Sequence, residues 1–274
     1  MNVKLLLVLL PLIITIFFLE KKIYAQQLVL EKEKNTNSIT CVSIDRNGKF
    51  VIGDAKGNIT QYDSLGNLIS RFSPTELSTP CSIEAWRTMN LFVFYKELQQ
   101  FILLDRFLAS SSTFELNLEE IGFSRVATIS QDNMIWLFDE INFRLKKYNP
   151  TTSKLINETP LDLILDPRDF NITSIREYQN LLFISDQNQG ILLFDNLGNY
   201  KKTIPASGIT YFNFLEEELY YTKDNTLFFI NIYTLKERRI TLPMKNSIIF
   251  VLVTEKKIIT FEKNKFYILN IRSH

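Results

Sequence analysis

The feature of this sequence that most constrains its fold is an internal repeat of roughly forty residues. Each copy contains an apolar strand, a polar turn, a second and very apolar strand, another turn, and an alternating strand that ends in Asp or Asn. The clearest copies are Ile39–Ser73 and Ile172–Pro205. Both contain an Asp-x-Leu-Gly-Asn turn, at Asp63–Asn67 and Asp195–Asn199, whose Gly and Asn accept the positive φ of tight hairpins.

The residues that end the third strand of each copy set the spacing of the repeat. They are Asp63, Asp105, Asn149, Asp195, Asn231 and Asn270. Their spacings of 36 to 46 residues bracket the ~40–45 residues of a four-stranded propeller blade. The second strands are apolar on both faces, which is typical of strands sandwiched between neighbouring sheets. The sequence therefore predicts an all-β, six-bladed β-propeller of four-stranded antiparallel blades at 39–74, 80–117, 122–160, 172–206, 209–243 and 247–274.

The two ends of the repeat region complement each other. The last copy has only three strands, while residues 27–32 form a short predicted strand without a blade of its own. We expect this strand to complete the last blade, which would close the ring and leave no exposed sheet edge. A β-sandwich or open barrel is the competing architecture, but the period near forty disfavours it. The only helical turns expected lie between blades, at 116–122 and 160–167.

Two of the copies resemble the NHL-like and quinoprotein-like β-propeller superfamily, whose repeats commonly read strand, Asp-x-x-Gly-Asn, strand, Asp, turn, Gly. The matching residues are Asp54 to Asn58 followed by Asp63 and Gly66, and Asp186 to Gly190 followed by Asp195 and Gly198. The middle copies replace these turns, and the chain has only 8 glycines. The resemblance thus implies the fold and no specific family within it.

The first 25 residues differ from the repeats and have the features of a secretory signal. Lys4 precedes an apolar run over Leu5–Leu19, and Ala25 is a small residue before the expected cleavage point. The charged segment Glu20–Lys22 is unusual for a cleaved signal and leaves an N-terminal anchor open, although a run containing Pro11 is short for a membrane span. We expect an exported chain, with residues 26–274 as a single propeller domain, located in the periplasm or at the outer membrane in a bacterium.

Charge and histidine content exclude several functions. The chain has 31 Lys and Arg against 30 Asp and Glu, and loss of residues 1–25 would remove three basic and one acidic residue, leaving a net charge of −1. A near-neutral chain without a basic run has no electrostatic attraction for nucleic acid. The one histidine, His274, is terminal, so neither a Ser-His-Asp triad nor a His-based zinc site is expected.

One set of carboxylates recurs at the turn between the second and third strands. Its members are Asp54, Asp139, Asp186, Asp224 and Glu262. These turns share one face of a propeller, so the set could hold a hard cation such as calcium through its oxygens. Asp is also a common first residue of turns because its side chain caps local backbone N–H groups, and we favour this local role. No cofactor is otherwise expected.

Three aromatic residues and two cysteines are further candidates. Trp86, Trp136 and Phe143 lie at strand ends or turns, where an exposed ring could contact a partner protein or stack on a sugar. Such rings more often fill contacts between blades, and Phe143 is expected to be the most exposed of the three. Cys41 and Cys81 begin the first strands of neighbouring copies, and both a disulfide and two small core side chains are compatible with that placement.

These observations favour a binding function. The first hypothesis is an exported, non-catalytic binding or scaffold protein that engages another envelope protein through the wide loop faces of the propeller. The second is a cation-dependent hydrolase or lactonase that uses the axial carboxylates, which similar six-bladed folds support. The third is glycan binding through exposed aromatic side chains.

Overall fold

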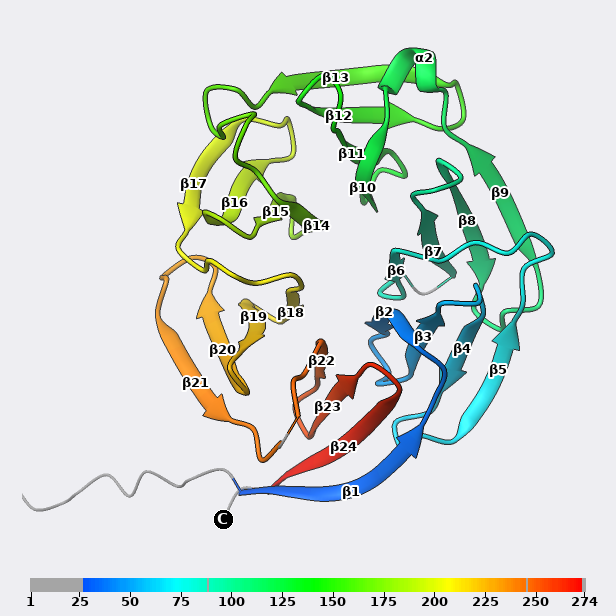
Figure 1. Cartoon of the computed structure of the whole chain (residues 1–274), viewed down its shortest axis with the longest axis vertical. Coiled ribbons are helices and arrows are strands. Elements are labelled where there is room, and N and C mark those ends of the chain that lie inside the picture. Colours follow the sequence, from blue (N-terminus) through cyan, green and yellow to red (C-terminus); the bar gives the residue numbers. More distant parts are fainter. Residues whose placement is uncertain (1–26, 88, 245, 273–274) are drawn as a thin grey trace, which may run out of the picture.

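A computed structural model describes residues 27–87, 89–244 and 246–272. These residues form six four-stranded antiparallel sheets that are arranged as a ring (Figure 1). The six-bladed β-propeller predicted from the repeat is therefore confirmed. The predicted signal segment, 1–25, lies outside the described residues. Within the described ranges, no helix has the length and apolar character needed to cross a membrane.

The blades are numbered here in chain order, and each is given from its innermost to its outermost strand. Blade 1 contains β2 (Ile39–Ile44), β3 (Phe50–Asp54), β4 (Ile59–Tyr62) and β5 (Leu68–Phe72). Blade 2 contains β6 (Ser82–Glu84), β7 (Asn90–Tyr95), β8 (Gln100–Asp105) and β9 (Ser111–Glu115). Blade 3 contains β10 (Ser124–Ile129), β11 (Ile135–Asp139), β12 (Arg144–Asn149) and β13 (Lys154–Pro160).

The second half of the ring follows the same order. Blade 4 contains β14 (Ile172–Tyr178), β15 (Leu181–Asp186), β16 (Gly190–Asp195) and β17 (Tyr200–Ile204). Blade 5 contains β18 (Asn213–Leu215), β19 (Glu218–Lys223), β20 (Thr226–Asn231) and β21 (Glu237–Thr241). Blade 6 contains β22 (Phe250–Val253), β23 (Lys257–Glu262), β24 (Lys265–Arg272) and β1 (Gln27–Asn35). A short helix, α2 (Leu118–Ile121), lies between blades 2 and 3, within the predicted segment 116–122.

The core of the protein lies between the blades rather than in one central mass. Six clusters of buried apolar side chains are present, and each joins two neighbouring blades. The second strands contribute most to these clusters, because both of their faces pack against a neighbour; every residue of β3 and of β11 is buried. The outermost strands are mostly exposed or alternate. The doubly apolar second strands of the sequence are thus explained by packing on both faces.

The repeated Asp-x-Leu-Gly-Asn turns have the predicted backbone. Gly66 and Gly198 have φ of 74° and 82°. In the first turn the Asp63 carboxylate accepts hydrogen bonds from the backbone N–H groups of Leu65 and Asn67, at 2.9 and 2.8 Å. The backbone N–H groups of the turn are satisfied by a side chain of the same five residues. The local sequence is therefore enough to predict this turn.

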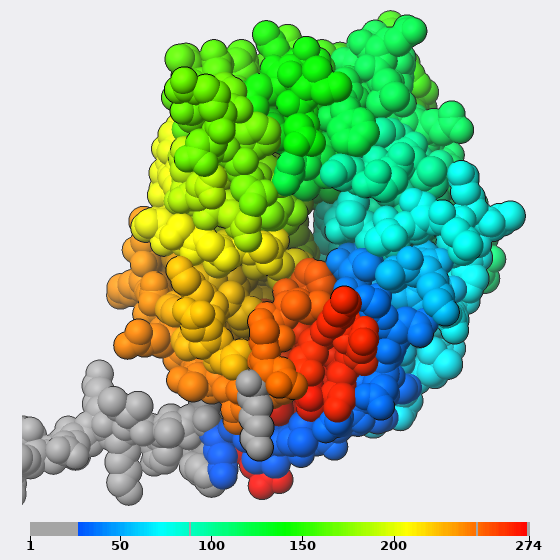
Figure 2. Space-filling model, viewed as in Figure 1, coloured from blue at the N-terminus to red at the C-terminus, as the bar shows by residue number. Residues whose placement is uncertain are grey.

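The N-terminal strand closes the ring, as predicted. β1 pairs antiparallel with β24, in a register that runs from Gln27 opposite Arg272 to Asn35 opposite Lys265. Both strands are longer than predicted: β1 continues beyond residue 32, and β24 continues past Asn270 because β1 supplies a partner to its end. The blue and red strands lie side by side in Figure 1, and the space-filling view keeps a narrow opening at the centre of the ring (Figure 2).

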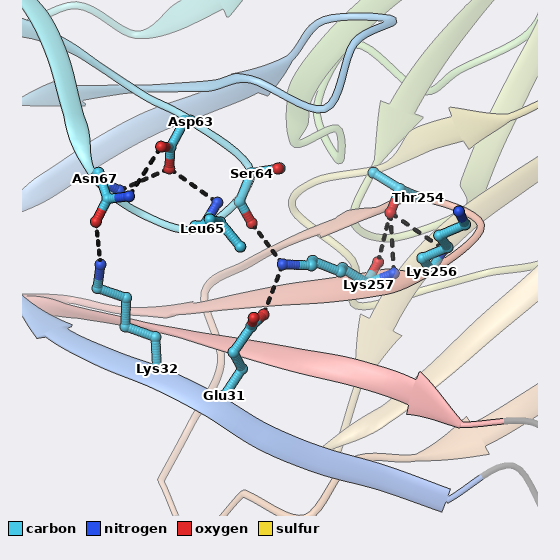
Figure 3. A network of polar contacts seen from close by, with 9 residues as sticks. All are labelled: Glu31, Lys32, Asp63, Ser64, Leu65, Asn67, Thr254, Lys256 and Lys257. Carbon is cyan, nitrogen blue, oxygen red and sulfur yellow. Dashed lines mark hydrogen bonds and ion pairs between the residues drawn. The ribbon is translucent and has the colours of Figure 1, made fainter.

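Polar contacts join the closing strand to blade 1 as well as to blade 6 (Figure 3). The Lys257 ammonium of β23 donates to Glu31 of β1 at 2.6 Å and to the backbone carbonyl of Ser64 at 2.9 Å. The Lys32 ammonium of β1 donates to the side-chain oxygen of Asn67 at 2.8 Å. The turn at Asp63–Asn67 therefore docks against the strand that closes the last blade.

Candidate binding site at the central opening

A cavity of about 770 Å³ opens where the ring narrows. Neighbouring strands of a blade are antiparallel, so the turns after the first and third strands share one face of the ring, here called the 1–2 face. The cavity is lined by residues of that face from blades 1, 2, 4, 5 and 6, including Arg46, Trp86, Tyr178, Leu215 and Lys256. Five blades therefore build one depression that combines aromatic, apolar and charged side chains.

A second cavity, of about 320 Å³, lies among the innermost strands. Its walls come from β2, β6, β10 and β14, from the segment before β18 and from Lys96 after β7. They include Ser174 and Tyr211. Arg176 lines both cavities. It is the one described residue that lines both of them.

Arg176 is held in place by blade 5. Its Nη1 donates to the side-chain oxygen of Asn213, and its guanidinium carbon lies 5.6 Å from the centroid of the Phe214 ring. Phe214 stacks on Tyr178, with centroids 4.1 Å apart and planes 5° apart. The Nε of Arg176 is buried and has no hydrogen-bond partner among the described residues. One edge of an oriented guanidinium is thus unused.

Glu84 is a buried carboxylate beside this site. It is 4% exposed, one oxygen accepts from the Trp86 indole at 2.6 Å, and the other accepts from the Thr128 hydroxyl of blade 3. Burial raises the pKa of Glu84 and outweighs the opposite effects of the Arg176 charge and of these two hydrogen bonds. The charge of this carboxylate is therefore disfavoured by the fold.

A similar indole–carboxylate pair joins blades 3 and 4. The Trp136 indole donates to Glu177 at 2.9 Å, and the other Glu177 oxygen accepts from the backbone N–H of Gln131 at 3.0 Å. The backbone N–H of Glu177 in turn donates to the Thr128 hydroxyl at 3.4 Å. Polar side chains of the innermost strands thus tie blades 2, 3 and 4 together around the opening.

The predicted carboxylates lie on the opposite face, at the turns between the second and third strands. Most of them accept hydrogen bonds from neighbouring groups of the protein. Asp54 accepts from the backbone N–H groups of Lys56 and Asn58 and from the Asn37 amide, and Asp186 accepts from the backbone N–H groups of three residues. Asp139 pairs with the buried Lys146 ammonium at 2.9 Å. Glu262 accepts from Asn246 and Tyr267, and Asp224 is exposed.

These hydrogen bonds have an electrostatic consequence. Burial opposes ionisation of Asp54 and of Asp139, but the hydrogen bonds from Asn37, Asn58, Asn142 and Lys146 outweigh it, and both pKa values lie below the ordinary value. Within residues 27–87, 89–244 and 246–272, no group of three or more His, Cys, Asp or Glu side chains is placed to hold a metal ion. The structure does not bring the five predicted carboxylates together.

The aromatic candidates are only partly where the sequence suggested. Trp86 is half-buried and lines the larger cavity. Trp136 is fully buried, and Phe143, predicted to be the most exposed, is only 9% exposed, so that prediction is wrong. Phe143 has φ of 55°, which turns its ring inward against Phe138 and Phe170. Neither Trp136 nor Phe143 is available to a partner in this fold.

The two cysteines line the smaller cavity, and both thiols are free in the structure. Cys41 is buried and packs in the cluster between blades 1 and 2, whereas Cys81 is exposed. Of the two placements left open by the sequence, Cys41 has that of a small core side chain.

Sequence reasoning missed Arg176, which lines both cavities, and two further residues of the larger cavity, Tyr178 and Asn213. Arg176, Tyr178 and Asn213 lie in the first strands of their blades, and those strands were used only to define the repeat. The available signal was charge inside an apolar first strand, as at Glu84 and Arg176. Which neighbours those charges meet depends on the ring and cannot be seen in the sequence.

The fold and the site define a closed, six-bladed β-propeller with two cavities that share Arg176 in their linings. BamB from Moraxella catarrhalis, known from its crystal structure, is similar to this chain, with 12% sequence identity over 86% of each chain and a TM-score of 0.51. At that identity the likeness shows the fold alone. No family model matches the sequence, and no curated protein matches it.

Proposed function

We propose that this chain is a non-catalytic binding protein that engages another protein of the cell envelope through its 1–2 face. The observation that carries the proposal is the cavity of about 770 Å³ built by five blades. A depression assembled from turns on a rigid ring can vary in sequence without disturbing the fold, which is how propellers and other scaffolds acquire binding sites. The proposed envelope location rests on the secretory features of residues 1–25.

The composition of the cavity supports a protein partner. Trp86, Tyr178 and Arg176 belong to the residue types that most often dominate the binding energy of protein interfaces. Leu215 adds apolar surface at the rim, and Arg46 and Lys256 add charge around it. An apolar and aromatic centre with a charged rim is the usual arrangement of such interfaces.

Site-specific photo-cross-linking in the native cells tests this function. A photoreactive amino acid at Lys256, which is exposed on the rim of the cavity, is expected to give a discrete cross-linked product. The matched control is the same amino acid at Ile156, which is 56% exposed on the outermost strand of blade 3. Identical products from both positions, or none from Lys256, would contradict the proposal.

The proposed location has its own test. A fusion of residues 1–26 to a reporter enzyme that is active only outside the cytoplasm should be active, and a charged substitution within Leu5–Leu19 should abolish that activity. An inactive fusion would remove the basis for an envelope partner.

A further inference from the structure

Arg176 is a cation without a carboxylate partner at the inner end of the smaller cavity. No ion pair between described residues includes it. Glu84, the buried acid that lines the same cavity, already accepts hydrogen bonds at both oxygens from Thr128 and Trp86. The positive charge of Arg176 is therefore not neutralised by a direct contact within the described part of the chain.

The orientation of the guanidinium is fixed before any ligand arrives. Asn213, which accepts from Arg176, is only 1% exposed and is itself held, because its oxygen also accepts from the backbone N–H of Phe214 at 2.8 Å and its amide donates to the Tyr211 hydroxyl at 3.0 Å. The Phe214 ring supports the guanidinium plane. A planar, oriented fork of N–H donors is the arrangement that recognises a carboxylate with two hydrogen bonds.

Two residues that line the smaller cavity carry unused donors. The Nε of Arg176 and the hydroxyl of Ser174 are both buried and have no hydrogen-bond partner among the described residues, and both residues line the smaller cavity. The Tyr211 hydroxyl accepts from Asn213 and so keeps its own proton to donate. Burial raises the pKa of Tyr211 to about 12, so this proton is retained at neutral pH. A buried donor without a partner costs about 1–3 kcal/mol, which a bound acceptor would recover.

The remaining walls indicate the size and character of the ligand. The cavity is about 320 Å³, at the small end of the range of pockets that hold metabolites. Three basic residues line it, Lys96, Arg125 and Arg176, against the single acid Glu84, although Arg125 is paired with Glu140. Val126, Ile175 and Phe212 add apolar surface. This combination suits an acid with an apolar body better than a fully polar anion such as phosphate.

We propose that this cavity binds the carboxylate of a small organic acid, with the Arg176 guanidinium as its ion-pair partner and the hydroxyls of Ser174 and Tyr211 as further donors. This ligand site is separate from the protein-binding cavity on the 1–2 face, to which it is joined only through Arg176. It would exist whether or not that face binds another protein.

Calorimetric titration of the purified protein tests the site. Hexanoate and benzoate are the probes, and hexanamide and benzamide, which have the same bodies without the charge, are the ligand controls. We expect saturable heat from at least one acid and a flat trace from its amide. Flat traces from both acids, or equal binding of an acid and its amide, would overturn the proposal. Tighter binding of inorganic phosphate than of either acid would overturn the assignment of a carboxylate.

Two variants of Arg176 and one control variant test whether acid binding depends on this guanidinium or only on the net charge of the protein. Arg176→Gln should weaken the acid at least about 10-fold, because it removes a charge-assisted hydrogen bond, and Arg176→Lys should weaken it less, because the charge remains without the fork. Arg87→Gln is the matched control, since its guanidinium lies away from the smaller cavity and donates to Ser130 and Asn133. Unchanged affinity in Arg176→Gln would overturn the proposal.

A second variant keeps the test valid if the arginine is needed for folding. Ser174→Ala removes one hydroxyl, and Arg176 and its support by blade 5 stay intact. We expect acid binding to weaken about 10-fold or more, because a hydroxyl that donates to a carboxylate makes a charge-assisted hydrogen bond. Acid affinity equal to that of the parent protein would count against the site. Because these titrations use the isolated protein, a failure of the cross-linking experiment does not affect them.

Discussion

Lys257 and Glu31 are 226 residues apart in the sequence, yet the Lys257 ammonium donates to the Glu31 carboxylate at 2.6 Å (Figure 3). The same ammonium donates to the Ser64 carbonyl at 2.9 Å. Lys257 belongs to blade 6, Glu31 to the closing strand and Ser64 to blade 1. One side chain therefore joins the three segments that meet where the ring closes.

Removing this side chain should weaken the closure measurably. We expect Lys257→Ala to lower the free energy of unfolding by about 1–2 kcal/mol, because its hydrogen bonds are charge-assisted and the ammonium is mostly buried. Lys265→Ala is the control, since Lys265 of β24 pairs with Glu33 of β1 in a more exposed position, where a pair contributes about 0–1 kcal/mol. Urea unfolding measures both; equal losses would show that Lys257 has no special part in the closure.

The closing strand as a whole should be required for cooperative folding. Deletion of Gln27–Asn35 leaves the edge of β24 unpaired. It also removes Leu28, which packs against the cluster between blades 5 and 6, and so uncovers part of that cluster. We expect a lower melting temperature, a broader transition and a tendency to associate, because an exposed edge pairs with other chains. Adding a peptide of residues 27–35 should restore the transition. A deletion variant that unfolds like the parent protein would show that the ring does not depend on β1.

The features predicted correctly from the sequence are those set by neighbouring residues. The turns at Asp63–Asn67 and Asp195–Asn199 satisfy their backbone donors within five residues, so the local sequence is enough to predict them. The spacing of the strands that precede such turns gives the number of blades. The strand after residue 26 has no blade of its own in the sequence, and the last repeat lacks one strand. The closure of the ring could therefore be predicted, because a closed propeller leaves no blade incomplete.

The features that were missed depend on contacts between distant residues. Phe143 has the sequence of an exposed turn residue, and its contacts include one with Phe170, from the segment before blade 4, which the local sequence does not indicate. Arg176 reads as an ordinary strand residue, and its importance comes from Asn213, 37 residues later on the next blade. Periodicity predicts which face of a strand is buried, but not which side chain lies opposite.

Two glycines with positive φ differ in how much space a Cβ atom would have, and this difference predicts different losses of stability when each is replaced by Ala. Gly190 has φ of 119°, and a Cβ at this position would lie 2.3 Å from the Ile204 carbonyl oxygen. Gly208 has φ of 83°, and the nearest atom to a Cβ there would be the Lys223 ammonium at 3.7 Å. Gly208→Ala should therefore lose only about 1–2 kcal/mol of stability from the backbone conformation. Gly190→Ala should lose a further ~1–3 kcal/mol from the clash. Equal losses of unfolding free energy in the two variants would show that the backbone at the β16–β17 end moves to remove the clash at no cost.

Calcium should bind weakly or not at all at the carboxylates opposite the 1–2 face. Asp54, Asp139 and Asp186 already accept hydrogen bonds from their own turns or from an ammonium, and a cation would have to displace those donors. We expect calorimetric titration with calcium to give no saturable heat. Saturable heat that disappears in Asp186→Asn would instead support the cation site and the hydrolase hypothesis.

The buried Glu84 predicts a specific dependence of stability on pH. Burial raises its pKa in the native protein above the ordinary value of 4.5, so the native state holds the proton more tightly than the unfolded chain does. The stability associated with this proton is present below pH 4.5 and is lost as the pH rises through the native pKa. The lowered pKa values of Asp54 and Asp139 act in the opposite direction, with stability lost as the pH falls.

Glu84→Gln separates these effects, because the aspartates are unchanged in the variant. The amide oxygen can still accept from Trp86, and its NH₂ group can donate to the Thr128 hydroxyl, so the packing is kept. We expect the stability of the variant relative to the parent protein to rise between pH 4 and pH 7, because only the parent protein must ionise a buried carboxyl group as the pH rises. Urea unfolding at several pH values measures the difference. A difference that stays flat or falls with pH would show that Glu84 is ionised in the fold at no cost, and that the Arg176 charge stabilises it more than burial opposes it.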